Sequence, residues 1–286
     1  MQLSSVITYP GGETRCVARV VAAVPRPSGD GGSVVVLDRT CFHPLDHTWP
    51  DQPSDSGRLR LGAEEIPVID GVTCAYDGDG RFAVGAEIPA RRGDEDYHFV
   101  VGHVVAAPAD TLPVGTEVEV LVDEDLRADL STGHSACHVA AMALNEVTDG
   151  YWNKDARQDS RGHRDLDNQF ITVSRIGRRT STDSYRVGKS ARKKGLRAQE
   201  LLDELPSVEA RLNDLLRSWV EAGGAITLTP QVCALDAKRQ WSADLGGNPA
   251  VIPCGGTHLT DVAQLAGLTV RLTAEEAGFT MLSTVD

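Results

Sequence analysis

The sequence contains no apolar run that approaches the ~18 residues of a membrane-spanning helix, so we expect no membrane span. Its N-terminal residues lack the basic start and apolar stretch of a secretion signal, so we expect a cytoplasmic protein. No internal repeat or low-complexity tract is visible. The hydrophobic share of 41% and the charged share of 24% are instead typical of a globular protein.

Cysteines are few, and their spacing does not form a disulfide framework. The six lie at positions 16, 41, 74, 137, 233 and 254, in a chain too long to need disulfides for stability. We therefore expect free thiols, one of which can serve as a thiolate metal ligand.

Positive charge is scarce overall, but one segment concentrates it. The formal charge is −13, which argues at first against binding to nucleic acid. Residues 154–197, however, contain 13 Lys or Arg against 5 Asp, a local charge of +8 that leaves −21 for the rest. This segment can follow an RNA backbone, or it can be a solvated face that balances nearby acids. The RNA-binding candidates are Arg186, Lys189, Arg192, Lys193, Lys194 and Arg197.

A length of 286 residues favours two domains over one. Residues 1–125 contain short β-branched runs at 33–37, 99–105 and 116–122, separated by Gly, Pro and Asp turns, which predict a small β-barrel or sandwich. Residues 126–286 mix helical and strand patterns and predict helices on an antiparallel sheet. The predicted fold class is therefore α+β.

Two helices are expected in the second domain. Ser131 or Thr132 can cap a helix that carries His134 and His138 on one face. An apolar stripe with 3- and 4-residue spacing runs from Leu201 to Trp219 and stops at residues 223–224, both Gly. We interpret this stripe as core and not as a partner surface.

Two distant segments each supply a pair of metal-type ligands at positions i and i+4. His134 and His138 form one pair, and Cys254 and His258 form the other, with two glycines between them. This spacing brings both members onto one helical face or one tight turn, so a single ion can join the segments. Imidazole and thiolate favour zinc over calcium or magnesium. The alternative is that no metal binds, so that the two histidines merely share a helix face and the cysteine is a buried free thiol.

These motifs resemble a known family. The segments GHSACH and CGGTHLTDVAQLAGL look like the zinc-binding signatures of the alanyl-tRNA synthetase editing domain and of its freestanding AlaX-like relatives. Residues 38–44 are similar to the family pattern D-x-T-x-F-x-P, residues 52–57 to Q-P-x-D-x-G, and residues 122–127 to V-D-x-x-x-R. The resemblance implies a Zn²⁺-dependent editing domain that hydrolyses the ester between an amino acid and the terminal ribose at the tRNA acceptor end, a step in translation fidelity.

The resemblance also implies roles for particular residues. His134 and His138 become catalytic as well as metal-binding, because zinc can activate water or hold the substrate in place. Four ligands, however, close a tetrahedral site, which is usually structural. Either one candidate lies off the metal, or the ion expands to five-coordination.

Substrate contacts are implied for Thr40 and Gln52, which occupy positions of the family's amino-acid pocket. Alternatively, Thr40 lies at the end of a strand and its hydroxyl forms hydrogen bonds within the protein only. Thr257 can hydrogen-bond near the ester or stabilise its turn. His43 and His47 belong to a region in which residues 45–51 replace a shorter, Gly-rich turn of the family, and His47 can act as an acid, a base or a substrate contact.

The sequence thus predicts a trans-acting deacylase that removes a noncognate hydroxy amino acid, serine or a threonine-like analogue, from tRNA. The altered loop motivates a narrower hypothesis, the fluorothreonyl-tRNA deacylase branch of the family. Two rivals are a noncatalytic tRNA-binding protein with a structural zinc site and a metal-dependent hydrolase of small esters or amides.

Overall fold

The computed structural model describes residues 5–26 and 31–286, so the first four residues, which bear on the expectation about a secretion signal, lie outside it. No helix among these residues is long and apolar enough to cross a membrane. The chain divides into two compact units. The first unit comprises Met1–Arg127, Leu228–Arg239 and Gly255–Thr257, and the second comprises Ala128–Thr227, Gln240–Cys254 and His258–Asp286.

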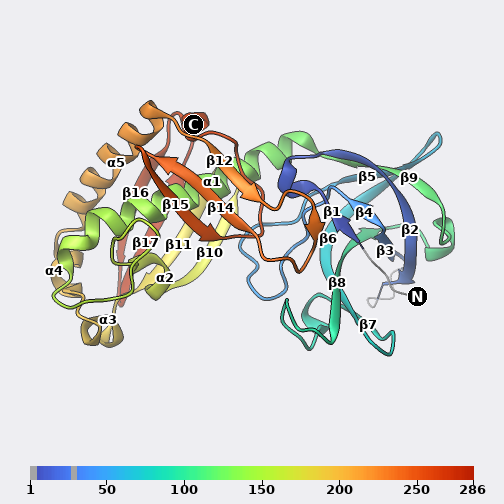
Figure 1. Ribbon diagram of the computed structural model, residues 1–286, viewed down its shortest axis with the longest axis horizontal. Coiled ribbons are helices and arrows are strands. Elements are labelled where there is room, and N and C mark those ends of the chain that lie inside the picture. The colour runs from blue at the N-terminus through green and yellow to red at the C-terminus, as the bar shows by residue number, and fades with distance from the viewer. Residues whose placement is uncertain (1–4, 27–30) are drawn as a thin grey trace. The chain divides into compact units, whose positions relative to one another are not determined.

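The first unit is built on a closed antiparallel β-barrel (Figure 1). Around the barrel the strands follow the order β5 (Gly57–Leu61), β9 (Glu117–Val122), β2 (Arg15–Pro25), β3 (Ser33–Leu37), β8 (Tyr97–Val105) and β6 (Glu64–Asp77). Pairing of β5 with β6 closes the ring, and β7 (Phe82–Val84) extends β6. The predicted N-terminal barrel is confirmed.

Alternating burial along the strands forms the barrel core. β2 begins with alternating exposed and buried residues, which is the period expected when one strand face is solvated. Side chains such as Leu37, Leu59, Val101 and Val120 are fully buried in this core. A small separate sheet joins β1 (Val6–Ile7), β4 (Arg39–Thr40) and β13 (Cys233–Ala234).

The second unit is an α+β assembly, as predicted, but its strands form two sheets and not one. The larger sheet is antiparallel, in the order β10 (Ile171–Gly177), β11 (Thr180–Arg186), β17 (Gly278–Thr284) and β16 (Thr269–Glu275). The smaller has the order β12 (Ile226–Thr229), β14 (Gln240–Leu245) and β15 (Asn248–Pro253). The α-helices are α1 (Glu124–Thr148), α2 (Leu166–Phe170), α3 (Lys189–Lys193), α4 (Ala198–Asp203) and α5 (Leu205–Ala222). Short 3₁₀ helices occupy Tyr9–Gly11, Gly85–Glu87, Ala109–Thr111, Asp149–Tyr151 and Val262–Leu265.

Helix α1 begins earlier than the sequence predicted. The expected cap at Ser131 or Thr132 is wrong, because the helix starts at Glu124 and both residues lie inside it. Asp123 caps the helix instead, since its carboxylate accepts a hydrogen bond of 3.0 Å from the Leu126 amide. Thr132 directs its hydroxyl back to the Ala128 carbonyl, at 2.9 Å.

The apolar stripe predicted for one helix is divided between α4 and α5. Pro206 lies in the first turn of α5, where its missing N–H costs nothing, so the chain restarts a helix there. The α5 members of the stripe are largely buried, which confirms their core role. Two side chains of α5 form hydrogen bonds with the backbone of β16, an edge strand of the larger sheet. Asn213 bonds Val270, and Glu209 accepts from the Leu272 amide.

Candidate metal centre

The metal-type ligands come from a helix and from a loop of the second unit. His134 and His138 lie one turn apart in the middle of α1, where the i and i+4 spacing places them on one face. Cys254 directly follows β15, and His258 lies four residues further on. The loop then enters a 3₁₀ helix through a capping box between Asp261 and Gln264, which fixes its exit.

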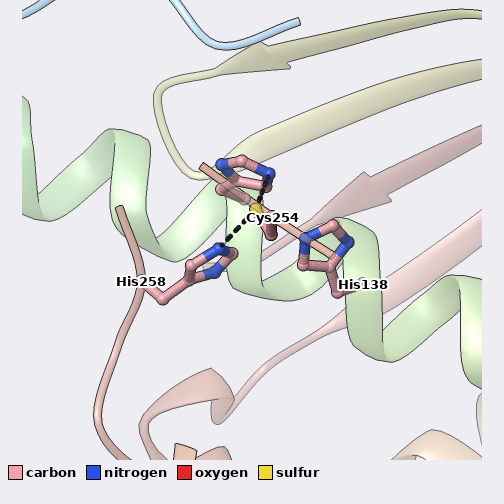
Figure 2. Close-up of side chains that lie close together, drawn as sticks. His138, Cys254 and His258 are labelled. Atoms are coloured by element: carbon pink, nitrogen blue, oxygen red, sulfur yellow. Dashed lines mark hydrogen bonds between the residues drawn. The ribbon is translucent and has the colours of Figure 1, made fainter. Parts of the chain in front are cut away.

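The structure brings all four predicted ligands together. Their donor atoms lie within 4.8 Å of one another. Cys254 Sγ is 3.2 Å from His258 Nε2 and 3.6 Å from His134 Nε2. Figure 2 shows the side chains of His138, Cys254 and His258 gathered beside α1. Two segments more than a hundred residues apart therefore form one cluster.

The residues fit a zinc ion. Zinc bonds of ~2.0 Å to nitrogen and ~2.3 Å to sulfur place tetrahedral ligands roughly 3.5 Å apart, close to the two S···N separations given above. His138 Nε2 is buried and has no hydrogen-bond partner within residues 5–26 and 31–286. Such an orphaned nitrogen is costly unless a ligand occupies it. Coordination to a cation would provide that partner.

The surroundings of His134 and His138 favour the neutral imidazole, which is the form that binds metal. Burial lowers the pKa of His134 to about 3. Burial, and then the neighbouring His134, holds the pKa of His138 well below its usual range. Trp241 is fully buried and packs against the rings of His138 and His258, at centroid distances of 5.0 and 5.9 Å. This indole excludes water from one side of the cluster.

Ser135 orients His258, one of the four candidate ligands, a role that the sequence did not reveal. Its Oγ lies 3.2 Å from His258 Nδ1 and accepts a hydrogen bond of 2.9 Å from the Leu259 amide. When Nε2 of His258 faces the metal, Nδ1 carries the proton and donates it to Ser135. The hydroxyl thus holds the loop and the ring together, next in sequence to His134.

Gln52 and Thr257, predicted substrate contacts, bind each other within the first unit. Gln52 Nε2 donates to Thr257 Oγ1 at 2.9 Å, and the Thr257 amide donates to Gln52 Oε1 at 3.0 Å. Both residues are buried. The pair anchors the Gly255–Thr257 segment to the barrel unit, and its contact with substrate stays a prediction.

Thr40 lies inside the barrel unit and has no exposed surface. His103 Nδ1 donates to the Val35 carbonyl at 3.0 Å, so its Nε2 accepts the Thr40 hydroxyl at 2.8 Å. Thr40 Oγ1 also accepts from the Phe42 amide at 3.0 Å. This network holds the hydroxyl in one orientation, and the predicted substrate role of Thr40 stays untested.

The two loop histidines are also packed in the first unit. His47 Nε2 donates to the Ala90 carbonyl at 3.1 Å, and its ring stacks on Phe99. His43 is buried with its ring edge-on to Tyr9. Each is held in a defined orientation, and neither is assigned a contact with substrate by the structure.

Two further residues of the family-like motifs form a buried ion pair. Arg127 Nε donates to Asp55 Oδ1 at 2.8 Å, its Nη2 bonds Asp55 Oδ2, and Nη2 also donates to the Cys41 carbonyl at 2.7 Å. The His43 amide donates to Asp55 as well, at 2.5 Å. Both side chains are nearly inaccessible to solvent. The Q-P-x-D-x-G and V-D-x-x-x-R patterns therefore meet in a structural contact.

The basic segment separates into paired and unpaired charges. Arg157, Arg161, Arg164, Arg178 and Arg197 form ion pairs with carboxylates of the second unit. The remaining RNA-binding candidates form no ion pair with any residue that the structure describes, and all are exposed: Arg186, Lys189, Arg192, Lys193 and Lys194. Lys194 Nζ lies 5.3 Å from the centre of the Phe170 ring.

The fold and the site define an α+β protein with a barrel unit and a three-histidine, one-cysteine candidate metal centre. No family model matches the chain. The chain is similar to the alanyl-tRNA editing protein AlaX-M of Pyrococcus horikoshii, with 24% identity over 238 residues, which cover 82% of this chain and 77% of that protein. This match confirms the resemblance to the AlaX-like editing family.

Proposed function

We propose that this chain is a trans-acting aminoacyl-tRNA deacylase of the cytoplasm. It would hydrolyse the ester between a noncognate hydroxy amino acid and the terminal ribose of tRNA. One observation supports this above all: four metal-type donor atoms from two distant segments lie within 4.8 Å of one another. They do so in a chain similar over most of its length to an alanyl-tRNA editing protein.

Zinc is the proposed cofactor, held by His134, His138, Cys254 and His258. When bound, the ion supplies a Lewis acid that polarises the ester or activates water. Ser135 orients His258, and Trp241 excludes water from one side. His134 is 2% exposed, whereas the other three ligand residues are half-buried. We therefore expect substrate to approach past these three residues, on the side of the cluster that Trp241 does not cover.

The proposed substrate carries serine or a threonine-like analogue, with fluorothreonine as the narrower hypothesis. Support comes from the loop at residues 45–51, which replaces the Gly-rich turn in the resemblance to the family and is held by contacts within the loop and with Arg92. Asp46 Oδ1 accepts from the Thr48 amide at 2.7 Å, and Asp46 Oδ2 lies 3.0 Å from Arg92 Nη2. A fixed, bulky loop reshapes the neighbouring surface more than glycines would.

The tRNA acceptor end is the proposed partner. The exposed cations on and around α3, namely Arg186, Lys189, Arg192 and Lys193, lack acidic partners among the described residues and remain available for phosphates. The acidic remainder of the chain would limit adhesion of RNA elsewhere.

A deacylation assay tests the proposal. Purified wild type and His138→Ala should be incubated with tRNA charged with serine, threonine or fluorothreonine, and the release of amino acid measured. We expect release by wild type and loss of turnover in a folded His138→Ala variant. Binding of zinc and tRNA without any release would favour the noncatalytic rival. Hydrolysis of simple aminoacyl esters but not of charged tRNA would favour the small-ester hydrolase.

A further inference from the structure

Arg239 is a buried cation without a carboxylate partner. It lies in the first unit and is only 5% exposed. Its Nη1 donates to the carbonyls of Leu235 at 3.0 Å and Ala234 at 3.5 Å. Within the part of the chain that the structure describes, it forms no ion pair, and its Nε has no hydrogen-bond partner. A buried charge without a counter-ion is costly, so its presence calls for a compensating anion.

Nη2 of this guanidinium lies close to the glycine turn and has no carboxylate partner among the described residues. Arg239 Nη2 lies 2.9 Å from the point that a β-carbon of Gly255 would occupy, and Arg92 Nη1 lies 3.4 Å from the same point. Gly255 does not have a positive φ, so any side chain here would be opposed by the two guanidinium groups and not by the backbone conformation. Two guanidinium groups thus converge over one glycine, an arrangement that an anion between them would stabilise.

Among residues 5–26 and 31–286, Arg92 has a carboxylate partner and Arg239 has none. Arg92 Nη2 lies 3.0 Å from Asp46 Oδ2. Arg239 has instead the ring of Tyr9, 5.8 Å away, whose hydroxyl donates to the Gly255 carbonyl at 3.0 Å. Tyr9 therefore holds the turn and the guanidinium in fixed positions before any ligand arrives.

We propose that Arg239 and Arg92 form a binding site for a phosphate group, and that the ligand is a phosphate of the tRNA acceptor end. The planar guanidinium fork matches phosphate oxygens, which accept two parallel hydrogen bonds. Gly255 directly follows Cys254, and consecutive Cα atoms are ~3.8 Å apart. A phosphate held there would position the end of the nucleic acid. This inference depends on the proposed deacylase function for the identity of the ligand.

The decisive comparison uses two substrates that differ in phosphate. Aminoacyl-tRNA carries phosphates, whereas the aminoacyl ester of adenosine carries none. Arg239→Gln should lower kcat/KM for the charged tRNA about 10- to 100-fold, mainly through KM, since a charged hydrogen bond contributes ~1.5–3 kcal/mol. It should leave hydrolysis of aminoacyl-adenosine unchanged, and Arg239→Lys should restore part of the loss. An equal loss with both substrates would overturn the proposal and assign Arg239 a structural role.

Two controls distinguish a loss of phosphate binding in Arg239→Gln from a general effect of the lost charge and from unfolding. Arg15→Gln removes an equally charged side chain that is exposed and pairs with Glu119 in the same unit, and it should behave as wild type. Thermal unfolding shows whether Arg239→Gln remains folded. If it does not, Arg92→Gln carries the same expectation, because Arg92 faces the same point and is partly exposed. An unchanged KM for charged tRNA in Arg92→Gln would then overturn the proposal.

A binding titration distinguishes this site from the proposed function. Inorganic phosphate and the trinucleotide CpCpA are titrated into wild type and Arg239→Gln by calorimetry. Loss of CpCpA binding in the variant supports the site even if no charged tRNA is hydrolysed. Deacylation by wild type with identical CpCpA binding in both proteins supports the function and overturns the site. Binding of inorganic phosphate without CpCpA would also overturn the nucleic-acid assignment.

Discussion

A single hydroxyl, that of Ser135, connects the ligand loop to the ligand helix. It contacts both His258 Nδ1 and the Leu259 amide. Ser135→Ala should therefore weaken zinc binding, by about 10- to 100-fold if it acts as hydrogen-bonding partners of metal ligands usually do. Competition with a chelator of known affinity measures this. Ser135→Thr should restore binding, while Ser218→Ala, at an exposed position of α5, should have no effect. Equal affinities in Ser135→Ala and wild type would contradict this role.

Removal of one partner of the buried Arg127–Asp55 pair should strongly destabilise the first unit. Arg127→Ala leaves Asp55 charged and buried, which typically costs about 3–5 kcal/mol. Chemical denaturation followed by circular dichroism would show this loss. Arg58→Ala removes the exposed pair with Glu65 and should cost no more than ~1 kcal/mol. Similar losses for the two variants would show that the buried pair is not special.

At the residue scale, sequence spacing predicted which four side chains form the cluster, but not the residues that contact them. The pair of Cys254 and His258 and the pair of His134 and His138 are recognisable as candidate ligands, because the two residues of each pair are only four positions apart. The Ser135 contact with His258 spans 123 residues, and the Arg127 contact with Asp55 spans 72. No local pattern marks such contacts, because only the fold brings the partners together.

At the scale of elements, Gly133 permits close packing between α1 and the β10–β11 hairpin. A β-carbon there would lie 2.5 Å from the carbonyl oxygens of Gly177 and Thr180. Gly133→Ala should push the hairpin from the helix, destabilise the protein by roughly 1–3 kcal/mol, and weaken zinc binding at the adjacent His134. Gly150→Ala is the matched control, because its β-carbon would meet nothing within 4 Å. Thermal unfolding and zinc titration of both variants test this, and equal behaviour would refute it.

His103 joins three strands and makes the barrel sensitive to acid. It lies on β8 and bonds Val35 of β3 and Thr40 of β4. Burial lowers its pKa to about 4, whereas an unfolded histidine has a pKa of about 6.5. The unfolded state thus binds the proton more readily, so stability is present above pH ~6.5 and is lost as pH falls toward 4, by about 3 kcal/mol at most.

The His103 contribution is isolated by comparison with a variant. Unfolding free energies of wild type and His103→Gln should be measured between pH 7 and 4. The difference between the two unfolding free energies should shrink as the pH falls. In wild type alone, His103 is protonated in the unfolded state at low pH and must lose this proton, or be buried with it, when the protein folds. A difference independent of pH would contradict the neutral, buried state of His103.

Sequence patterns predicted the strand at residues 33–37 better than the ends of the helices. The run at residues 33–37 coincides with β3, because β-branched residues with flanking turn residues fit a buried strand. Ser131 and Thr132 seemed suitable caps, yet Asp123 begins α1 two turns earlier, since several residues of this segment can cap and packing selects among them. Pro206 similarly restarts α5 within a continuous apolar stripe.

At the scale of the whole molecule, an acidic chain presents a local cationic surface. The formal charge is −13, while Arg186, Lys189, Arg192 and Lys193 are exposed. Replacing these four by Gln should weaken tRNA binding and reduce the slope of log K against log salt by roughly 0.7–0.9 for each phosphate that the variant no longer binds. Titrations at several salt concentrations measure the slope. An unchanged slope would exclude this surface from the RNA interface.

The set of residues that forms each unit could not be predicted from local sequence patterns. Residues 228–239 and 255–257 belong to the first unit although they lie far along the chain. Hydropathy and turn patterns describe local structure, so they do not indicate that these two late segments pack in the first unit. The Gln52–Thr257 contact and the small β1–β13 pairing provide its physical basis.

The most direct test is X-ray absorption at the zinc edge of the purified protein. We predict one zinc per chain with a single sulfur neighbour at ~2.3 Å and nitrogen neighbours at ~2.0 Å. Cys254→Ser should remove the sulfur contribution. A protein that retains no zinc, or a shell without sulfur in the wild type, would contradict the account.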